Sequence, residues 1–424
     1  MNKKHKRPWG VFLAIVLAIV FGSWAGEKGG IFGITFYAIV DVLGIIFLNA
    51  LTLVVVPLVS SSIISGISRI GNEGAFGRLG GKMFTFYIGT SLLAILIGLF
   101  FVNLIGPGLS HIAPIGGSVN SAELTQLQAQ IADNEGALVK LLLQIIPSNV
   151  LAAFSHGEML GMIFFSLLFG YAISKIDAHP ASILNGFFQG IFQTMIQVTH
   201  IIMKFLPYGV FCLVAKVFMT TGPGSLGSVA LFFVTVVLGL AVFMFIGLPL
   251  MLKFIGRVSP LRHFKAMAPA LVTAFSTSSS SATLPITIDC VEKRAGVSNR
   301  ICSLVVPLGT SINMSGSALY ECVAAIFVAQ VYGIDISFTT QFIVVFMALI
   351  TSIGVAGIPS ASLVAILVIL KVIGLPTEGI GLFVAVDRLL DMCRTTVNVF
   401  SDSCCAILVA TSEGEKVLKS DQFD

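Results

Sequence analysis

The chain has 424 residues, of which 56% are hydrophobic and only 10% are charged, and its net charge is +4. A soluble domain carries about 25% charged residues, so this chain cannot cover a water-facing surface of its size. The composition excludes a soluble enzyme, a disordered scaffold and a nucleic-acid-binding protein, and it leaves a polytopic α-helical membrane protein. Seven cysteines lack the spacing of a metal site and lie in or beside apolar stretches, which indicates small hydrophobic side chains rather than ligands.

The charged residues are separated by uncharged runs long enough to cross a bilayer, which takes about 20 apolar residues. The first run, 8–26, follows a basic N-terminal cluster and has no small-residue cleavage site, so we expect a retained span rather than a signal peptide. The positive-inside rule places both termini in the cytoplasm and the segment 106–136, which has no Lys or Arg, outside a bacterial-type plasma (inner) membrane. The later uncharged runs are 42–68, 83–122, 178–203, 217–252, 266–288, 301–320 and 336–370.

The run 266–288 does not fit an ordinary span, because basic residues flank it on both sides. Six consecutive hydroxyl residues, 276–281, lie in its middle, and Pro285 follows them. Non-helical backbone at membrane depth is tolerated only within protein or beside water, so the pattern predicts a re-entrant helical hairpin over 260–297. A flexible serine linker is the alternative, and the apolar flanks argue against it.

The rest of the C-terminal half repeats this arrangement. Span 7, 298–332, is interrupted between Gly309 and Gly316, and a second hairpin, 336–375, is interrupted between 352 and 360. Such paired broken segments predict inverted repeats whose tips meet at the midplane of a transporter, with the binding site between them. The predicted organisation has three parts. Residues 1–256 contain spans 1–6, and residues 257–412 form the core transport domain, which ends in span 8 at 377–412. Residues 413–424 form a cytoplasmic tail.

Span 8 carries a polar stripe. At about 100° per residue, its polar side chains fall within an arc of about 100°, and the opposite face is apolar. Charged residues inside a membrane are costly and indicate function, although a self-satisfied ion network is the structural alternative. The stripe consists of Asp387, Asp391, Arg394, Thr395, Asn398 and Asp402.

The residue types of the stripe indicate a ligand. Arg394 offers a planar fork for a carboxylate, Asp391 can hold an ammonium group, and Asn398 can bind a second carboxylate. An ammonium group with two carboxylates describes an acidic amino acid. Asp402 lies nearly three turns further along and suits a small cation, which takes oxygen ligands.

Two other classes of function are weaker fits. An intramembrane serine hydrolase would need a base near residues 276–281, and the sequence places no histidine beside them. A channel would need repeated weak sites rather than one stripe shaped for a ligand.

Four motifs, in this order and spacing, resemble the dicarboxylate/amino acid:cation symporters, which include archaeal aspartate transporters and excitatory glutamate transporters. The resemblance covers essentially the whole chain. The motifs are TSSSSATLP (277–285), INMSGSALYE (312–321), SIGVAGIP (352–359) and DMCRTTVNV (391–399).

The resemblance implies an all-α fold of eight transmembrane helices plus two opposed re-entrant hairpins, assembled as a homotrimer. Spans 1, 2, 4 and 5 would form a scaffold, and spans 3, 6, 7 and 8 with both hairpins would move across the membrane as an elevator. The implied function is symport of aspartate, glutamate or a dicarboxylate with sodium and/or protons, without any cofactor. A proton-coupled dicarboxylate or neutral amino acid symporter of the same fold stays open.

The resemblance also implies site residues. Substrate would contact Ser279, Ser280, Met314, Ser317, Gly357, Ile358, Asp391, Arg394, Thr395 and Asn398. One sodium site would use Gly309, Asn313, Asn398 and Asp402. A second sodium site would use Ser311, Ser352, Ile353 and Val355. A further sodium site would use Tyr87, Thr90, Ser91, Asn313 and position 315.

The sequence departs from the family at that further site, because Ser315 stands where the family has an aspartate and Ser317 where it has a threonine. A hydroxyl supplies an oxygen but no charge, so we expect fewer sodium ions per cycle than in three-sodium relatives. Glu321 occupies a position that marks the proton-coupled animal transporters. Burial of a carboxylate favours its protonated form, so Glu321 is a candidate proton carrier, with pairing to Arg388 as the alternative.

Overall fold

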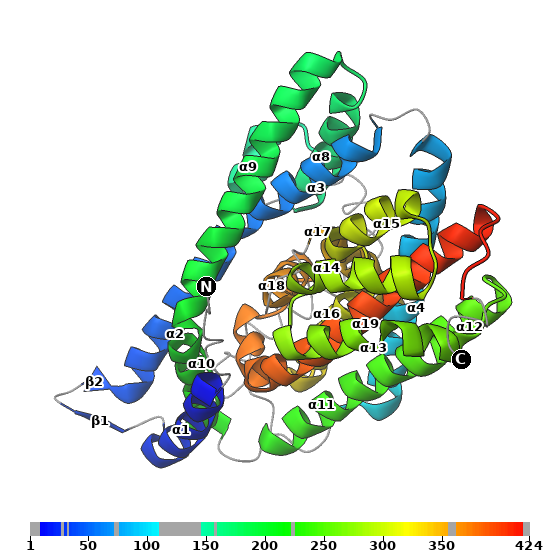
Figure 1. The fold of residues 1–424 in the computed structure, drawn as a ribbon. Coiled ribbons are helices and arrows are strands. Elements are labelled where there is room, and N and C mark those ends of the chain that lie inside the picture. Colours follow the sequence, from blue (N-terminus) through cyan, green and yellow to red (C-terminus); the bar gives the residue numbers. More distant parts are fainter. Residues whose placement is uncertain are drawn as a thin grey trace, which may run out of the picture.

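The computed structural model describes residues 9–26, 29–31, 34–71, 76–109, 146–156, 159–221, 225–354 and 362–418. Within these ranges the chain is almost entirely helical (Figure 1). Its two short strands, β1 (Gly30–Ile31) and β2 (Ile34–Thr35), pair antiparallel. The fold class predicted from composition is therefore confirmed at the level of a helical protein.

The first half of the described chain forms an elongated layer of helices. The helix α10 follows α9 after a short 3-10 turn, and together they lie along α2 and α3 (Figure 1). The elements of this layer are α1 (Trp9–Ala25), α2 (Phe36–Leu53), α3 (Val55–Gly71), α7 (Val150–His156), α8 (Met159–Ile173), α9 (Ala178–Ile202), η2 (Met203–Phe205) and α10 (Leu206–Thr221).

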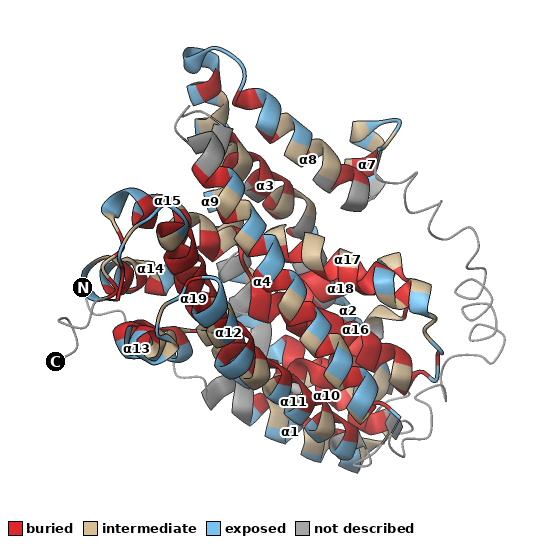
Figure 2. Cartoon of the chain, turned by 90° about the vertical axis from the view of Figure 1, so that its right-hand side faces the viewer, coloured by how far each residue is buried: buried red, intermediate tan, exposed pale blue. Residues whose placement is uncertain are grey.

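The remaining helices form a compact core around α16 (Ser315–Val331), whose residues are almost all buried (Figure 2). α16 contacts α4 (Phe76–Ile105) closely, because a Cβ at Gly98 would lie 2.9 Å from the Leu319 side chain. The other helices of this core are α11 (Ser225–Val242), η4 (Phe243–Gly247), α12 (Leu248–Phe254), α13 (Pro260–Thr277), α14 (Ser280–Asp289), η5 (Cys290–Arg294), α15 (Asn299–Ile312), α17 (Phe338–Gly354), α18 (Ser362–Val372), η6 (Thr377–Ile380) and α19 (Gly381–Ser412).

Several helices have the length and surface of membrane spans. Three stretches of the described chain, Leu79–Ile105, Gly227–Phe254 and Asn299–Val331, are long and apolar enough to cross a bilayer. Large apolar side chains are exposed on the outer helices, including Trp24 on α1 and Phe338 on α17. Such a surface is stable in hydrocarbon and unfavourable in water, which agrees with the low content of charged residues.

The serine-rich run forms a tight turn between two helices. α13 and α14 contact each other and are joined at Ser278, which has a left-handed φ of 51°, and at Ser279. Ser279 caps α14 by accepting a hydrogen bond from the backbone N–H of Ala282 at 3.2 Å, because serine hydroxyls satisfy the free amides of a first turn. α17 and α18 form a second contacting pair, and residues 355–361 between them lie outside the described residues.

The predicted interruption of span 7 is present. α15 ends at Ile312 and α16 begins at Ser315, with Asn313 and Met314 in non-helical conformations between them. The break leaves backbone amides at the start of α16 that face α19, and this places the polar stripe of α19 against the unwound segment.

Candidate substrate and cation site

Arg394 is the centre of a buried charged cluster on α19. Its side chain is fully buried, and Nη2 donates hydrogen bonds to Oδ1 of Asp387 and to Oδ1 of Asp391, both at 3.0 Å. Its guanidinium carbon lies 3.9 Å from the centre of the Tyr320 ring, in a cation–π contact. Tyr320 also donates its hydroxyl to Oδ1 of Asp387 at 3.0 Å, so the arginine is held from two sides. We call Tyr320, Asp387, Asp391 and Arg394 the Arg394 cluster.

The Arg394 cluster does not use all the donors of its arginine. Nε and Nη1 are buried and have no hydrogen-bond partner among the described residues. A buried donor without a partner is unfavourable by about 1–3 kcal/mol, and more when it is charged. Nη1 forms an edge of the guanidinium fork together with Nη2, and this edge matches the two oxygens of a carboxylate.

Asn398 joins the stripe to the break in span 7. Its Oδ1 accepts hydrogen bonds from the backbone N–H groups of Gly316 at 2.8 Å and Ser317 at 3.4 Å, at the start of α16. Its Nδ2 lies 3.2 Å from Oγ of Ser317 and 3.3 Å from the sulfur of Met314. Gly316 permits this close approach, because a Cβ would lie 3.0 Å from the Arg394 carbonyl oxygen. Thr395 is buried beside these residues on α19.

Asp402 is a buried carboxylate without a cationic partner. Its Oδ1 accepts a hydrogen bond from Nδ2 of Asn313 at 2.9 Å, and its Oδ2 has no partner among the described residues. No ion pair of the described residues includes it. Gly309 packs directly on it, since a Cβ there would lie 2.6 Å from Oδ1. A buried carboxylate oxygen without a partner suits a small hard cation, which takes oxygen ligands.

A neutral network of hydroxyl and amide groups lies next to Asp402. Oδ1 of Asn313 accepts hydrogen bonds from Thr90 and Ser315, both at 3.0 Å. Ser315 is also 3.2 Å from the hydroxyls of Ser91 and Ser401. We call Thr90, Ser91, Asn313, Ser315 and Ser401 the Asn313 network. It brings together residues from α4, the span 7 break and α19.

Tyr87 and Glu321 belong to neither the Arg394 cluster nor the Asn313 network. The Tyr87 hydroxyl donates to the carbonyl oxygen of Val305 at 2.5 Å. Glu321 is fully buried on α16 and accepts a hydrogen bond from Thr351 of α17 at 2.8 Å. Arg388 faces Asp391 at 3.7 Å, so the suggested pairing of Glu321 with Arg388 is not found.

Only some of the site residues expected in the two hairpins lie within the described residues. Ser280 is buried at the start of α14, which packs on α19, and Ser279 is half-buried. Ser352 is buried on α17 and donates a hydrogen bond to the Leu349 carbonyl oxygen, and Ile353 is the next residue of this helix. Ser311 is half-buried on α15, which contacts α17. The expected site residues Val355, Gly357 and Ile358 lie outside the described residues.

Two of these contacts were not predicted from the sequence. Tyr320 stacks on Arg394 and Thr351 binds Glu321, but neither belongs to the stripe or to a polar run. A tyrosine directly before a glutamate within an apolar helix was a signal for both, because buried polar groups on a span need partners.

Comparison with known proteins gives the same family as the motifs. Residues 8–412 match the model of the sodium:dicarboxylate symporter family. The chain is 35% identical to a proton/sodium-glutamate symport protein of Bacillus caldotenax over 413 residues, which cover 96% of this chain and 94% of the relative. It is 32% identical to the proton/glutamate-aspartate symporter of Escherichia coli K12 over 412 residues, 97% of this chain and 94% of the relative.

One of the relatives is an animal protein. The chain is 32% identical over 409 residues to excitatory amino acid transporter 3 of Mus musculus, covering 85% of this chain and 76% of the relative. The match to the family model extends over nearly the whole described helical bundle and includes every residue of the Arg394 cluster and the Asn313 network. The chain therefore belongs to the sodium:dicarboxylate symporter family and is a membrane transporter rather than an enzyme.

Proposed function

We propose that this transporter takes up acidic amino acids, aspartate or glutamate, by symport driven by sodium and/or proton gradients. The observation that carries the proposal is the fully buried guanidinium of Arg394, whose Nε and Nη1 have no hydrogen-bond partner among the described residues. A substrate carboxylate on the Nη1–Nη2 edge would satisfy Nη1 and form two charge-assisted hydrogen bonds, in exchange for one that Nη2 now donates to an aspartate. The names of the bacterial relatives, which are glutamate and glutamate-aspartate symporters, support the same substrate class.

In this proposal the other end of the substrate lies against Asp391 and Asn398. Asp391 would bind the ammonium group, and Asn398 with Ser280 would bind the α-carboxylate. In the present arrangement Asn398 donates to Ser317, so binding requires that this hydrogen bond be exchanged for one to substrate. The amides at the start of α16 and α14 add positive potential for an anion.

The coupling cation would bind at Asp402. A single buried carboxylate with an unpartnered oxygen is neutralised either by a cation or by a proton, and Gly309 and Asn313 are its immediate neighbours. The Asn313 network carries no carboxylate and satisfies itself with internal hydrogen bonds. We therefore propose that it contributes no full sodium site and that fewer sodium ions are carried than in relatives with an aspartate at this position.

Glu321 is the proposed proton carrier. It is fully buried, and its hydrogen bond from Thr351 connects α16 to the first arm of the second helix pair. A carboxylate in such a place favours the neutral form, so its protonation can be linked to transport.

We further propose the membrane arrangement implied by the family: eight spans, two re-entrant hairpins, both termini in the cytoplasm and a homotrimer in the plasma membrane. The helices α1–α3 and α7–α10 would form the scaffold. The core around α16 and α19 would carry substrate across the bilayer as an elevator. Support comes from the separation of these two layers in Figure 1 and from the pairs α13–α14 and α17–α18.

The proposal is tested by reconstituting the full chain in lipid vesicles and measuring uptake of labelled aspartate, glutamate and succinate. Sodium and proton gradients are imposed separately, each with the other ion equal on both sides. We expect saturable accumulation of acidic amino acids above the external concentration with at least one gradient. Uptake that only equilibrates would indicate a channel, and accumulation of succinate without competition by aspartate would indicate a dicarboxylate transporter.

A further inference from the structure

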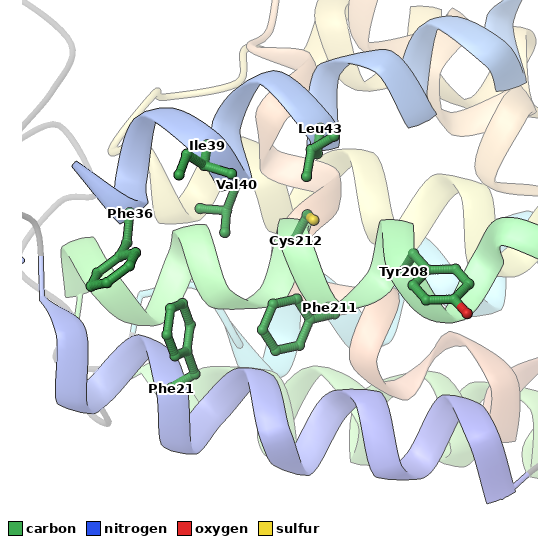
Figure 3. A pocket seen from close by; sticks show the side chains of 8 residues that line it. All are labelled: Phe21, Phe36, Ile39, Val40, Leu43, Tyr208, Phe211 and Cys212. Carbon is green, nitrogen blue, oxygen red and sulfur yellow. The ribbon is translucent and has the colours of Figure 1, made fainter. Parts of the chain in front are cut away.

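An apolar cavity of about 270 Å³ lies between α1, α2 and α10, far along the chain from the polar stripe (Figure 3). Its wall is formed by apolar atoms, so it offers no partner for a polar ligand. The lining side chains are Phe21, Phe36, Ile39, Val40, Leu43, Tyr208, Phe211 and Cys212.

The three helices around the cavity are held at fixed, short distances. A Cβ at Gly22 of α1 would lie 2.7 Å from the Ala215 carbonyl oxygen of α10. A Cβ at Gly209 of α10 would lie 2.3 Å from the Phe47 ring of α2, so this crossing also depends on a glycine. Because α1 and α10 meet through their backbones and the Phe47 ring packs directly on the backbone of α10, the helices cannot move closer to close the cavity.

Aromatic rings keep the cavity open between those contacts. The ring of Phe21 packs edge-on against Phe36 at a centroid distance of 5.5 Å and is tilted against Phe211 at 5.7 Å. In Figure 3 the three rings lie together at one end and along one side of the cavity. Rigid rings in mutual contact have few alternative rotamers, which makes the cavity a stable feature of the three-helix contact.

The cavity is continuous with the outer surface of the helices. Val40 and Cys212 are each 5% exposed and form its floor, whereas Leu43 is 49% and Tyr208 72% exposed and lie at its rim. In a membrane transporter, the exposed apolar surface of these helices faces hydrocarbon. The cavity is therefore a recess in the apolar outer surface of these helices.

We propose that this cavity is a binding site for one acyl chain of a bilayer phospholipid. Apolar cavities do not retain water, and one of about 150 Å³ is already large enough to hold a benzene ring. A recess of 270 Å³ that opens toward hydrocarbon accommodates a segment of an acyl chain, which is flexible enough to follow the ring-lined wall. The acyl chain would hold α1 and α2 against α10, a helix that also contacts α19 of the transport core.

The test uses the full chain reconstituted in phosphatidylglycerol vesicles that contain a trace of the same lipid with a diazirine in its acyl chain. After irradiation, labelled residues are mapped by mass spectrometry. We expect cavity residues to be labelled several-fold more than Val234, an exposed apolar residue on α11. Two variants fill the cavity, Cys212→Phe at the floor and Leu43→Trp at the rim. Each excluded methylene is worth about fourfold in binding, so labelling inside the cavity should fall at least about tenfold.

Val234→Phe is the matched control, because it adds bulk on the lipid-facing surface without filling the cavity, and it should leave cavity labelling unchanged. Leu43→Trp decides the question if Cys212→Phe does not fold, since the rim side chain is half exposed. Cavity labelling no higher than that of Val234 would overturn the proposal. So would cross-linking of Cys212 between two copies of the chain in place of lipid labelling, because a second copy would then occupy the recess.

Discussion

Two polar groups that both include residues of α19, the Arg394 cluster and the Asn313 network, differ in how completely their hydrogen-bonding groups are satisfied. The Arg394 cluster contains charges of both signs and still leaves two guanidinium donors without partners. The Asn313 network contains only neutral groups, and Ser315 and the side-chain oxygen of Asn313 both have internal hydrogen bonds. Asp402 lies between these extremes, with one oxygen bound and one without a partner.

This difference supports the proposed positions of the ligands. A charged, incompletely satisfied group gains from a ligand of opposite charge, whereas a neutral, closed network gains little and must first be opened. We therefore assign the substrate to the Arg394 cluster and the coupling cation to Asp402. The following variants test that assignment, starting with the largest expected effect.

Arg394→Cys should remove the binding of the substrate's side-chain carboxylate. Two charge-assisted hydrogen bonds of about 1.5–3 kcal/mol each are lost, so the affinity for aspartate should fall at least about 100-fold in vesicle uptake. Serine or alanine should become a substrate, because the ammonium and α-carboxylate partners remain. Arg394→Lys is the control, since it keeps the charge and removes the fork. Unchanged aspartate affinity in Arg394→Cys would place the substrate elsewhere.

Asp402→Asn should weaken the binding of the coupling cation. The substitution keeps the shape of the side chain and its neighbour Asn313 but removes the charge, so half-maximal sodium activation should need at least about tenfold more sodium. Asp289→Asn, an exposed carboxylate paired with Lys293, serves as the control and should behave like wild type. Identical sodium dependence in wild type and Asp402→Asn would remove this carboxylate from the cation site.

Asp391→Asn and Asp387→Asn separate two roles within the Arg394 cluster. Both carboxylates bind Nη2 of Arg394, but we assign the substrate ammonium to Asp391 alone. Asp391→Asn should therefore lower the affinity for aspartate about tenfold or more and lower the affinity for succinate less. Asp387→Asn, which removes the negative charge beside Tyr320 and Arg394, should weaken the binding of both substrates to a similar extent. Equal losses of aspartate and succinate in Asp391→Asn would indicate that this residue only positions the arginine.

Ser315→Asp should convert the closed Asn313 network into one that requires a cation. An unpaired buried carboxylate is unfavourable by about 3–5 kcal/mol, so the melting temperature should fall in choline buffer and recover when sodium is added. Ser315→Asn has the same size without the charge and should not show the sodium-dependent recovery. If both variants respond to sodium alike, the charge at position 315 is not what limits cation binding there.

Glu321→Gln should alter the pH dependence of uptake with a smaller effect on its maximum. Burial disfavours the charged form, so Glu321 gains a proton as the external pH falls and wild-type uptake should rise toward acidic pH. The glutamine variant cannot titrate, and its uptake should be independent of pH over the same range. Full activity with an unchanged pH profile would exclude Glu321 from proton coupling.

Much of the site could be predicted because it depends on local periodicity. The polar side chains between 387 and 402 recur at helical spacing, so their common face follows from the sequence and is found in α19. The break in span 7 follows similarly from two glycines around Asn and Ser in an apolar run, and the helix is interrupted at Asn313 and Met314. The second tip, with Gly357 and Ile358, stays a prediction.

The sequence by itself determined that this protein is a helical membrane transporter, which helices are interrupted, and which face of α19 is polar, because these depend on composition and on spacing within one element. Only the tertiary structure decided that Tyr320 stacks on Arg394, that Thr90 and Ser91 of α4 close the Asn313 network, and which donors remain without partners. These contacts join residues far apart in the chain. Their geometry depends on how closely two helices approach, as at Gly316 and Gly98, and no local pattern specifies that distance.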